Sequence, residues 1–274
     1  MFRYRMLSDQ DISQTINGSN GSVNQKIGFE YLYSIASVDA DGNTWADIEY
    51  TWVLYEQKTL MNKVAYDSSN PPAEVPPEAL GYSVMVGKGF SILISPDGEV
   101  VEVEGLDELY DAVLDELDID DWELRQQLEL LLETSFGEEA IKESCGELVF
   151  SSPDEPIRVG ESWSVTVERS LPIPIVVENE YTLRDYDGKI ATFDVFSTIV
   201  SSEEGMMDIV GVQLGYAVSG TQEGFIEVDT ESGLTLTSEI SQDISGEAIV
   251  IYDGEEMRIP LEMKSVTTLS IIFE

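Results

Sequence analysis

The sequence has no histidine and a single cysteine, Cys145. Without histidine the chain cannot build a Ser-His-Asp triad, a Cys-His pair or a histidine-ligated metal site. With one cysteine it cannot form a disulfide within the chain, so its stability must come from a hydrophobic core. We expect Cys145 to be a small buried residue of that core.

Basic residues are scarce in this chain. It carries 14 of them against 54 acidic residues, which gives a formal net charge of −40. Such a surface repels nucleic acid and anionic lipid head groups, so we expect no nucleic-acid partner. A dense acidic shell favours solubility and suits a high-salt environment.

Long apolar runs are also missing. No stretch of 18 apolar residues occurs, so no membrane-spanning segment is expected. The first residues, Met1–Arg5, lack the apolar segment of a signal peptide. Two alternatives follow, namely a cytosolic protein or an exported protein whose signal segment is absent from this sequence.

The segment Leu106–Cys145 carries the strongest helical pattern. Leu109, Val113 and Leu117 recur at helical spacing, and acidic residues fill the opposite face. After an acidic break the pattern continues, and this second run consists of Trp122, Leu128, Leu131 and Leu132. Such a stripe must be buried, and the segments on either side are the only candidates to cover it.

Both flanks of this helical region show the two-residue alternation of strands. Lys26–Val38 with Trp45–Tyr55 predicts one hairpin, and Phe90–Ser95 with Glu99–Val103 predicts another. Phe2–Leu7 alternates weakly and is expected to be an edge strand. After Pro156 the predicted strands are Ser162–Glu168, Ile175–Arg184, Ile190–Val200, Asp208–Val218, Gly224–Val228, Leu234–Ile240, Glu247–Tyr252 and Glu262–Phe273.

Consecutive hairpins imply an antiparallel meander. We therefore predict an α+β fold in which a large, half-barrel-like antiparallel sheet of roughly a dozen strands curves around the helical segment. The prediction is one domain, 1–274, with strands at about 1–103 and 157–273 and a helical insert at about 106–145.

No motif assigns chemistry to a particular residue. Asp39, Asp41 and Asn43 superficially resemble a calcium loop, but glycine precedes Asn43 and strands flank the turn. Carboxylates are so numerous that no pair stands out as a catalytic dyad. We predict no catalytic residue, no metal and no cofactor, and hence a protein that is not an enzyme.

Bulky and adaptable apolar residues favour a cavity between the sheet and the helices, because methionine and aromatic side chains fit apolar ligands. The candidate ligand-binding residues are Leu109, Val113, Leu117, Tyr82, Met85, Phe90, Met206 and Met207. An ordinary packed core is the alternative, since protein interiors usually close-pack.

Several segments resemble a known family. Tyr66–Ser69, Ile94–Val100 and Val103–Leu109 resemble uncharacterised bacterial exported proteins grouped as DUF6263, and Pro156–Trp163 is similar to that family's segment after its helices. Gly224–Ser238 is similar to hairpins of exported lipoproteins with half-barrel sheets. The resemblance spans about Lys26 to the end and implies an exported, periplasmic or cell-surface protein. Members resemble lipoproteins anchored through an N-terminal cysteine, which this sequence does not have.

Together these patterns predict a monomeric, non-enzymatic binding or carrier protein. Its partner would be an apolar or lipid-like small molecule held between the curved sheet and the helices. The alternative is a structural or protein-interaction module with a filled core, whose partner is an unknown protein.

Overall fold

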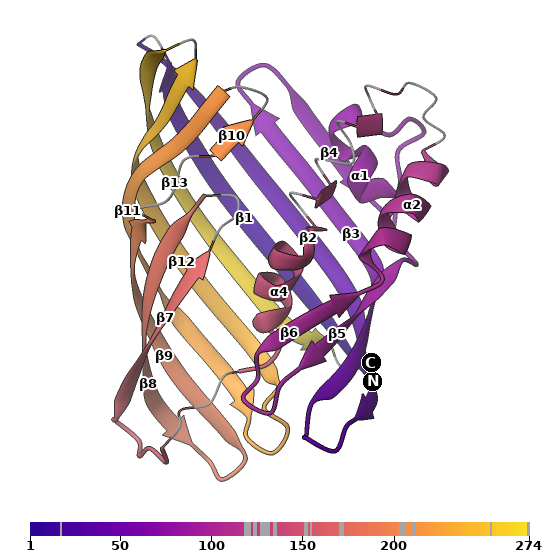
Figure 1. Cartoon of the computed structure of the whole chain (residues 1–274), viewed down its shortest axis with the longest axis vertical. Helices are drawn as coiled ribbons and strands as arrows, with labels where there is room; N and C mark the ends of the chain where they lie inside the picture. Colours follow the sequence, from indigo (N-terminus) through magenta and orange to yellow (C-terminus); the bar gives the residue numbers. More distant parts are fainter. Residues whose placement is uncertain are drawn as a thin grey trace.

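A single antiparallel sheet organises the molecule. The computed structural model describes residues 1–16, 18–117, 122, 125–126, 132–133, 136–150, 153, 155–169, 173–202, 207–209, 212–252 and 254–272. Thirteen strands lie in the order β6-β5-β3-β2-β1-β13-β12-β11-β9-β8-β7, with β4 added on β3 and β10 on β11 (Figure 1). Every strand pair that the structure describes is antiparallel, which confirms the predicted class of sheet.

Strands from both sides of the helical segment share this sheet. Its members are β1 (Phe2–Ile16), β2 (Ser19–Val38), β3 (Thr44–Thr59), β4 (Lys63–Asp67), β5 (Gly89–Ile94), β6 (Val100–Glu104), β7 (Ser162–Arg169), β8 (Ile175–Tyr186), β9 (Ile190–Ser201), β10 (Met207–Ile209), β11 (Val212–Asp229), β12 (Thr235–Tyr252) and β13 (Glu255–Ile272). The first and last strands, β1 and β13, pair with each other and join the two halves of the chain.

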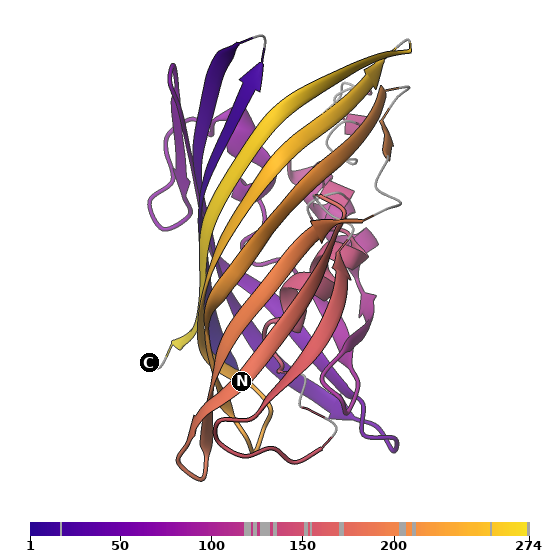
Figure 2. The ribbon, with the colours of Figure 1, turned by 90° about the vertical axis from the view of Figure 1, so that its left-hand side faces the viewer.

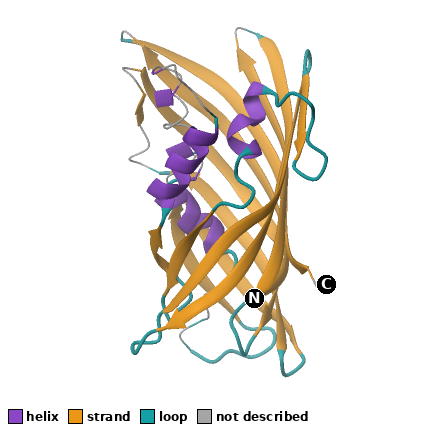
Figure 3. Ribbon diagram, turned by 90° about the vertical axis from the view of Figure 1, so that its right-hand side faces the viewer, coloured by secondary structure: helices purple, strands orange, loops and turns teal. Residues whose placement is uncertain are grey.

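The described helices are short and few. They are α2 (Leu106–Glu116) and α4 (Glu138–Gly146) in the predicted helical region, and α1 (Leu80–Ser83) after a 3₁₀ turn, η1 (Pro77–Ala79). The sheet curves around them, so that they lie on its concave side (Figures 1 and 3). None of the described helices is long and apolar enough to span a bilayer.

The long strands β11, β12 and β13 run side by side and bend along their length (Figure 2). Glycines let β11 approach β12 closely. A Cβ at Gly224 would stand 1.9 Å from the Glu239 carbonyl oxygen, and one at Gly220 would stand 2.2 Å from the Asp243 carbonyl oxygen. Glycine in a strand interior often marks such an approach or bend.

These glycines explain one wrong prediction. The sequence suggested separate strands at Asp208–Val218 and Gly224–Val228, whereas β11 runs without interruption from Val212 to Asp229. Likewise, the two strands predicted at Leu234–Ile240 and Glu247–Tyr252 form the single strand β12. The glycines interrupt the sequence pattern but not the hydrogen-bonded ladder.

Two further expectations were wrong. The segment Phe2–Leu7 is not an edge strand, because β1 lies between β2 and β13. Local alternation cannot reveal this, since the pairing partner β13 is the last strand of the chain. Trp122 was expected in a buried stripe, yet it is 67% exposed. Leu132 is buried as expected, whereas Leu128 and Leu131 lie outside the described residues.

Candidate functional site

Helix α2 packs against the first half of the sheet in what we call the helix-side cluster. Four of the candidate ligand-binding residues lie in it almost completely buried, namely Leu109, Val113, Met85 and Phe90. The cluster also contains Tyr4, Phe29, Tyr31, Tyr33, Tyr50, Ile92, Leu114, Leu132, Ile141, Cys145, Leu148 and Leu269. Burial this complete is typical of a close-packed interior.

The remaining four candidates lie at the edge of this cluster or outside the side chains that the structure describes. Leu117 and Tyr82 are half-buried and pack against the helix-side cluster. Met206 lies outside the described residues. Met207 is the first residue of β10, and its side chain is not among those described. The structure therefore brings six of the eight candidates to one cluster, and their role as ligand contacts stays a prediction.

Tyrosines give the helix-side cluster a neutral polar component. Burial raises the pKa of Tyr33 to about 12 and that of Tyr82 to about 12, with a smaller contribution from neighbouring ionisable groups. Burial likewise raises the pKa of the Cys145 thiol to about 12. These groups are therefore uncharged near neutrality, and Cys145 is the buried core residue that the sequence predicted.

A second apolar cluster lies on the concave face of the other half of the sheet. We call it the sheet-side cluster, and its buried members are Ile173, Ile175, Val177, Ile199, Val218, Ile244 and Leu261. Ile12, Tyr216 and Met263 are partly buried against them. All of these described members belong to strands or to the residues just before β8, in contrast to the helix-side cluster.

A line of uncharged polar side chains, which we call the amide row, borders the sheet-side cluster. Its members are Gln10 (β1), Ser265 (β13), Gln242 (β12), Gln222 (β11), Ser197 (β9) and Asn179 (β8). Each member lies directly opposite the next in the strand register. On β2 the line continues with Gln25, which is the partner of Gln10.

Strand alternation places the amide row on the concave face. Successive side chains point to opposite faces of a sheet, so residues two apart share a face. Two positions from Gln10, Ser265 and Gln242 lie Ile12, Met263 and Ile244, which belong to the sheet-side cluster. In the other direction along β1 and β13, the helix-side cluster contains Tyr4 and Leu269.

One acidic group lies close to a basic one near this face. Glu147 follows the last residue of α4, and part of its surface is exposed to solvent. Burial raises the pKa of the Glu147 carboxyl group, and the positive charge of Arg169 opposes this shift. Both groups also act on the pKa of Tyr181, which burial raises.

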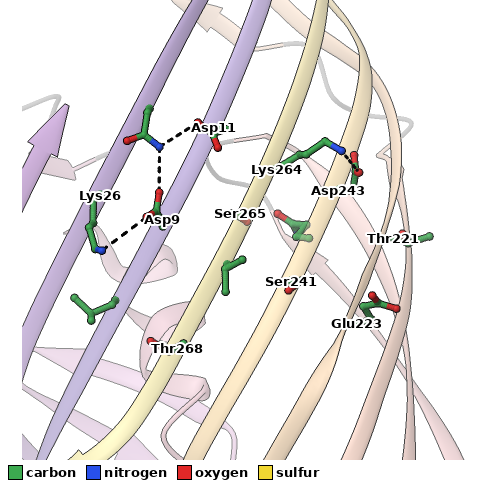
Figure 4. Close-up of a pocket in the computed structure, with 14 residues that line it drawn as sticks. Asp9, Asp11, Lys26, Thr221, Glu223, Ser241, Asp243, Lys264, Ser265 and Thr268 are labelled. Atoms are coloured by element: carbon green, nitrogen blue, oxygen red, sulfur yellow. Dashed lines mark hydrogen bonds and ion pairs between the residues drawn. The ribbon is translucent and has the colours of Figure 1, made fainter. Parts of the chain in front are cut away.

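The convex face has a different chemistry. A groove there is lined by charged and uncharged residues of β1, β2, β11, β12 and β13 (Figure 4). Its charges are largely paired, because Lys264 Nζ lies 2.8 Å from Asp243 Oδ2 and Lys26 Nζ lies 3.8 Å from Asp9 Oδ2. The groove therefore offers a ligand few unpaired charges.

No metal site emerges in the part of the chain that the structure describes, where no three Cys, Asp or Glu side chains gather to hold an ion. In the Asp39–Asn43 turn, the Asp39 carboxylate instead accepts hydrogen bonds from the Asp41 and Asn43 backbone N–H groups.

The amide row was not predicted from the sequence. Its only local signal is a glutamine or serine at one inward position of each strand.

Comparisons with known proteins place the chain in a family. The family model described as "Family of unknown function (DUF6263)" matches residues 41–235. No curated protein matches the sequence. A solved structure titled "Lipid-protein interactions in lipovitellin" is similar with a TM-score of 0.51 at 8% identity, over 99% of this chain and 25% of that chain. At this identity the likeness shows the fold alone, and this chain spans a quarter of the other's length.

Two bacterial structures are more distant. The OccK5 protein of Pseudomonas aeruginosa is 7% identical with a TM-score of 0.20, over 99% of each chain. An outer membrane channel from Pseudomonas putida F1 is 6% identical with a TM-score of 0.20, over 99% of this chain and 95% of that chain. Scores this low carry no argument about this chain.

Proposed function

Because this chain belongs to the DUF6263 family, whose function is unknown, we propose a function from its geometry. It is an exported, non-enzymatic carrier that binds an apolar or lipid-like molecule on the concave face of its sheet. The observation that carries the proposal is the sheet-side cluster, where the described apolar residues come from the sheet without a described helix across them. Apolar concave surfaces with a few polar groups are typical of small-molecule sites.

Fold similarity supports this proposal. The structure with a TM-score of 0.51 covers nearly the whole of this chain, and its title concerns lipid–protein interactions. A lipid tail requires apolar surface and no catalytic group, because transfer of each CH₂ out of water is favourable by about 0.8 kcal/mol. The sheet-side cluster offers such surface through Ile12, Tyr216 and Met263, which are only partly buried.

A second function has its own support. Leu109, Val113 and Met85 are almost completely buried in protein, as expected for a filled core. A structural or protein-interaction module with no small-molecule ligand accounts for this packing. The two functions differ in whether the purified protein takes up an apolar probe.

The test is binding of a fluorescent lipid probe with an uncharged head group, together with native mass spectrometry of the purified protein for a co-purified molecule. Met263→Glu places a charge in the sheet-side cluster and should weaken probe binding at least tenfold, since burying an unpaired charge is costly. Val266→Glu, on the same strand, is the matched control, because Val266 is exposed on the convex face. Absence of any probe binding or co-purified molecule in the wild type would favour the interaction module.

A further inference from the structure

We propose that the amide row selects amphipathic ligands whose head group is uncharged and carries hydroxyl groups, with the apolar tail against the sheet-side cluster. This inference rests on the proposed carrier function and names the substrate class. It starts from the position of the row, which crosses six neighbouring strands directly beside an apolar surface. Polar groups at the border of an apolar site fix the orientation of a ligand.

The row contains no charge although the chain carries a net charge of −40. The contrast appears within single strands. Gln10 lies between the exposed carboxylates Asp9 and Asp11, and Gln242 precedes the exposed Asp243. Strand alternation turns the charges to the convex face and the amides to the concave face. The concave face is therefore selectively uncharged along this line.

The row keeps hydrogen-bonding capacity for a ligand. A primary amide offers two N–H donors and a carbonyl acceptor. Gln10 Nε2 donates to Ser8 Oγ at 3.1 Å, and Gln242 Nε2 lies 3.5 Å from Gln222 Oε1, which is at the limit of a hydrogen bond. Among the described contacts these use only part of the capacity of the three half-buried glutamines.

At the β8 end the row is already satisfied and rigid. Ser197 Oγ donates to Asn179 Oδ1 at 2.7 Å, and both side chains are buried. This pair fixes the end of the row, so the three glutamines are the members that can contact a head group. Hydroxyl groups suit them best, because a hydroxyl both donates to the amide carbonyl and accepts from the amide N–H.

Charged head groups fit poorly at this site. A carboxylate or ammonium group that leaves water needs a partner of opposite charge, and the row supplies none. The acidic surface further disfavours an anionic head group through its long-range field.

The experiment compares three probes with the same twelve-carbon chain below their micelle concentrations. They are monolaurin, with a hydroxyl head group, laurate, with an anionic one, and dodecyltrimethylammonium, with a cationic one. Titration calorimetry at pH 8 should give monolaurin at least tenfold tighter binding than either charged probe. If no probe binds, the carrier function itself fails. If either charged probe binds as tightly as monolaurin, the carrier stands and the selectivity inference is wrong.

Variants then locate the selectivity. Gln242→Leu keeps the size of the side chain but removes its hydrogen bonds, so it should weaken monolaurin binding about fivefold to tenfold. Laurate binding should change less than twofold. Gln213→Leu is the matched control, since Gln213 lies on β11 with its side chain exposed on the face opposite to the amide row. Gln222→Leu repeats the test if Gln242→Leu does not fold. Unchanged monolaurin preference in a folded row variant would overturn the proposal.

Discussion

Buried tyrosines are the residues whose chemistry the fold changes most. Tyr4, Tyr31 and Tyr33 lie in contact on the concave face, with ring centroids of Tyr4 6.5 Å from Tyr31 and 6.3 Å from Tyr33. Burial raises the pKa of each of the three phenols. The folded protein therefore holds them protonated at a pH where the unfolded chain would release those protons.

This difference predicts alkaline instability. Above pH 10 the unfolded chain binds fewer protons than the folded one, so the free energy of unfolding must fall as the pH rises. Below pH 9 the stabilisation is fully present. The shift of Tyr33 alone, from 10.0 to about 12, corresponds to about 2–3 kcal/mol by pH 12. Urea unfolding at pH 8, 10 and 11 measures the trend.

Two phenylalanine variants separate this effect from general charge repulsion. Tyr33→Phe should flatten the fall of stability with pH, because it removes one buried proton-binding group. Tyr186→Phe should leave the slope unchanged, since Tyr186 is exposed. Equal slopes in both variants and the wild type would argue against burial of the phenols as the cause.

Leu114 of α2 and Leu117, the residue that follows the helix, test how tightly this segment is packed. Leu114 is 1% exposed, whereas Leu117, at the end of the same stripe, is half-buried. We expect Leu114→Trp to overpack the core and cost about 1–3 kcal/mol in unfolding free energy. Leu117→Trp should cost under about 1 kcal/mol, because part of its side chain faces open space. Thermal and urea unfolding of the pair provide the measurement.

The ligand candidate Leu117 gains a functional readout from the same variant. If its open side borders the ligand, a folded Leu117→Trp variant loses uptake of the uncharged fluorescent lipid probe. Retained uptake would remove Leu117 from the ligand site, and unfolding of Leu117→Trp would show that the end of α2 is as closely packed as its middle.

At the scale of whole elements, turns were easier to predict than strand neighbours. Gly42 and Gly188 adopt positive φ in hairpin turns, a conformation that glycine favours, so their sequence signals are local. The place of β1 beside β13 depends on residues at opposite ends of the chain. The amide row could not be predicted for the same reason, because its register requires the order of strands that are distant in sequence.

The strand glycines give a prediction at this scale. Gly224→Ala should destabilise the protein by about 1–3 kcal/mol, because the new methyl group would meet the backbone of β12, which cannot rotate away. Gly21→Ala on β2 is the matched control, since the nearest atom to its Cβ would lie 4.0 Å away. Urea midpoints of the two variants should therefore differ clearly, and similar values would contradict a close approach of β11 and β12.

At the scale of the whole molecule the dominant feature is charge. The 14 basic residues can pair with only a minority of the 54 acidic ones. Pairs such as Lys264–Asp243 and Arg184–Asp194 lie on exposed surfaces, where ion pairs contribute little. The folded state brings the remaining carboxylates closer together than the unfolded chain does, so their repulsion opposes folding.

Salt should therefore stabilise the protein. At an ionic strength of about 1 M the screening length falls to about 3 Å, against about 30 Å at 0.01 M, so repulsion between carboxylates is largely removed. We expect the melting temperature to rise from low to molar sodium chloride. Magnesium or calcium at equal ionic strength should act somewhat more strongly without a stoichiometric isotherm, since the described residues offer no metal cluster. A constant melting temperature would mean that the acidic residues are too widely spaced to oppose folding.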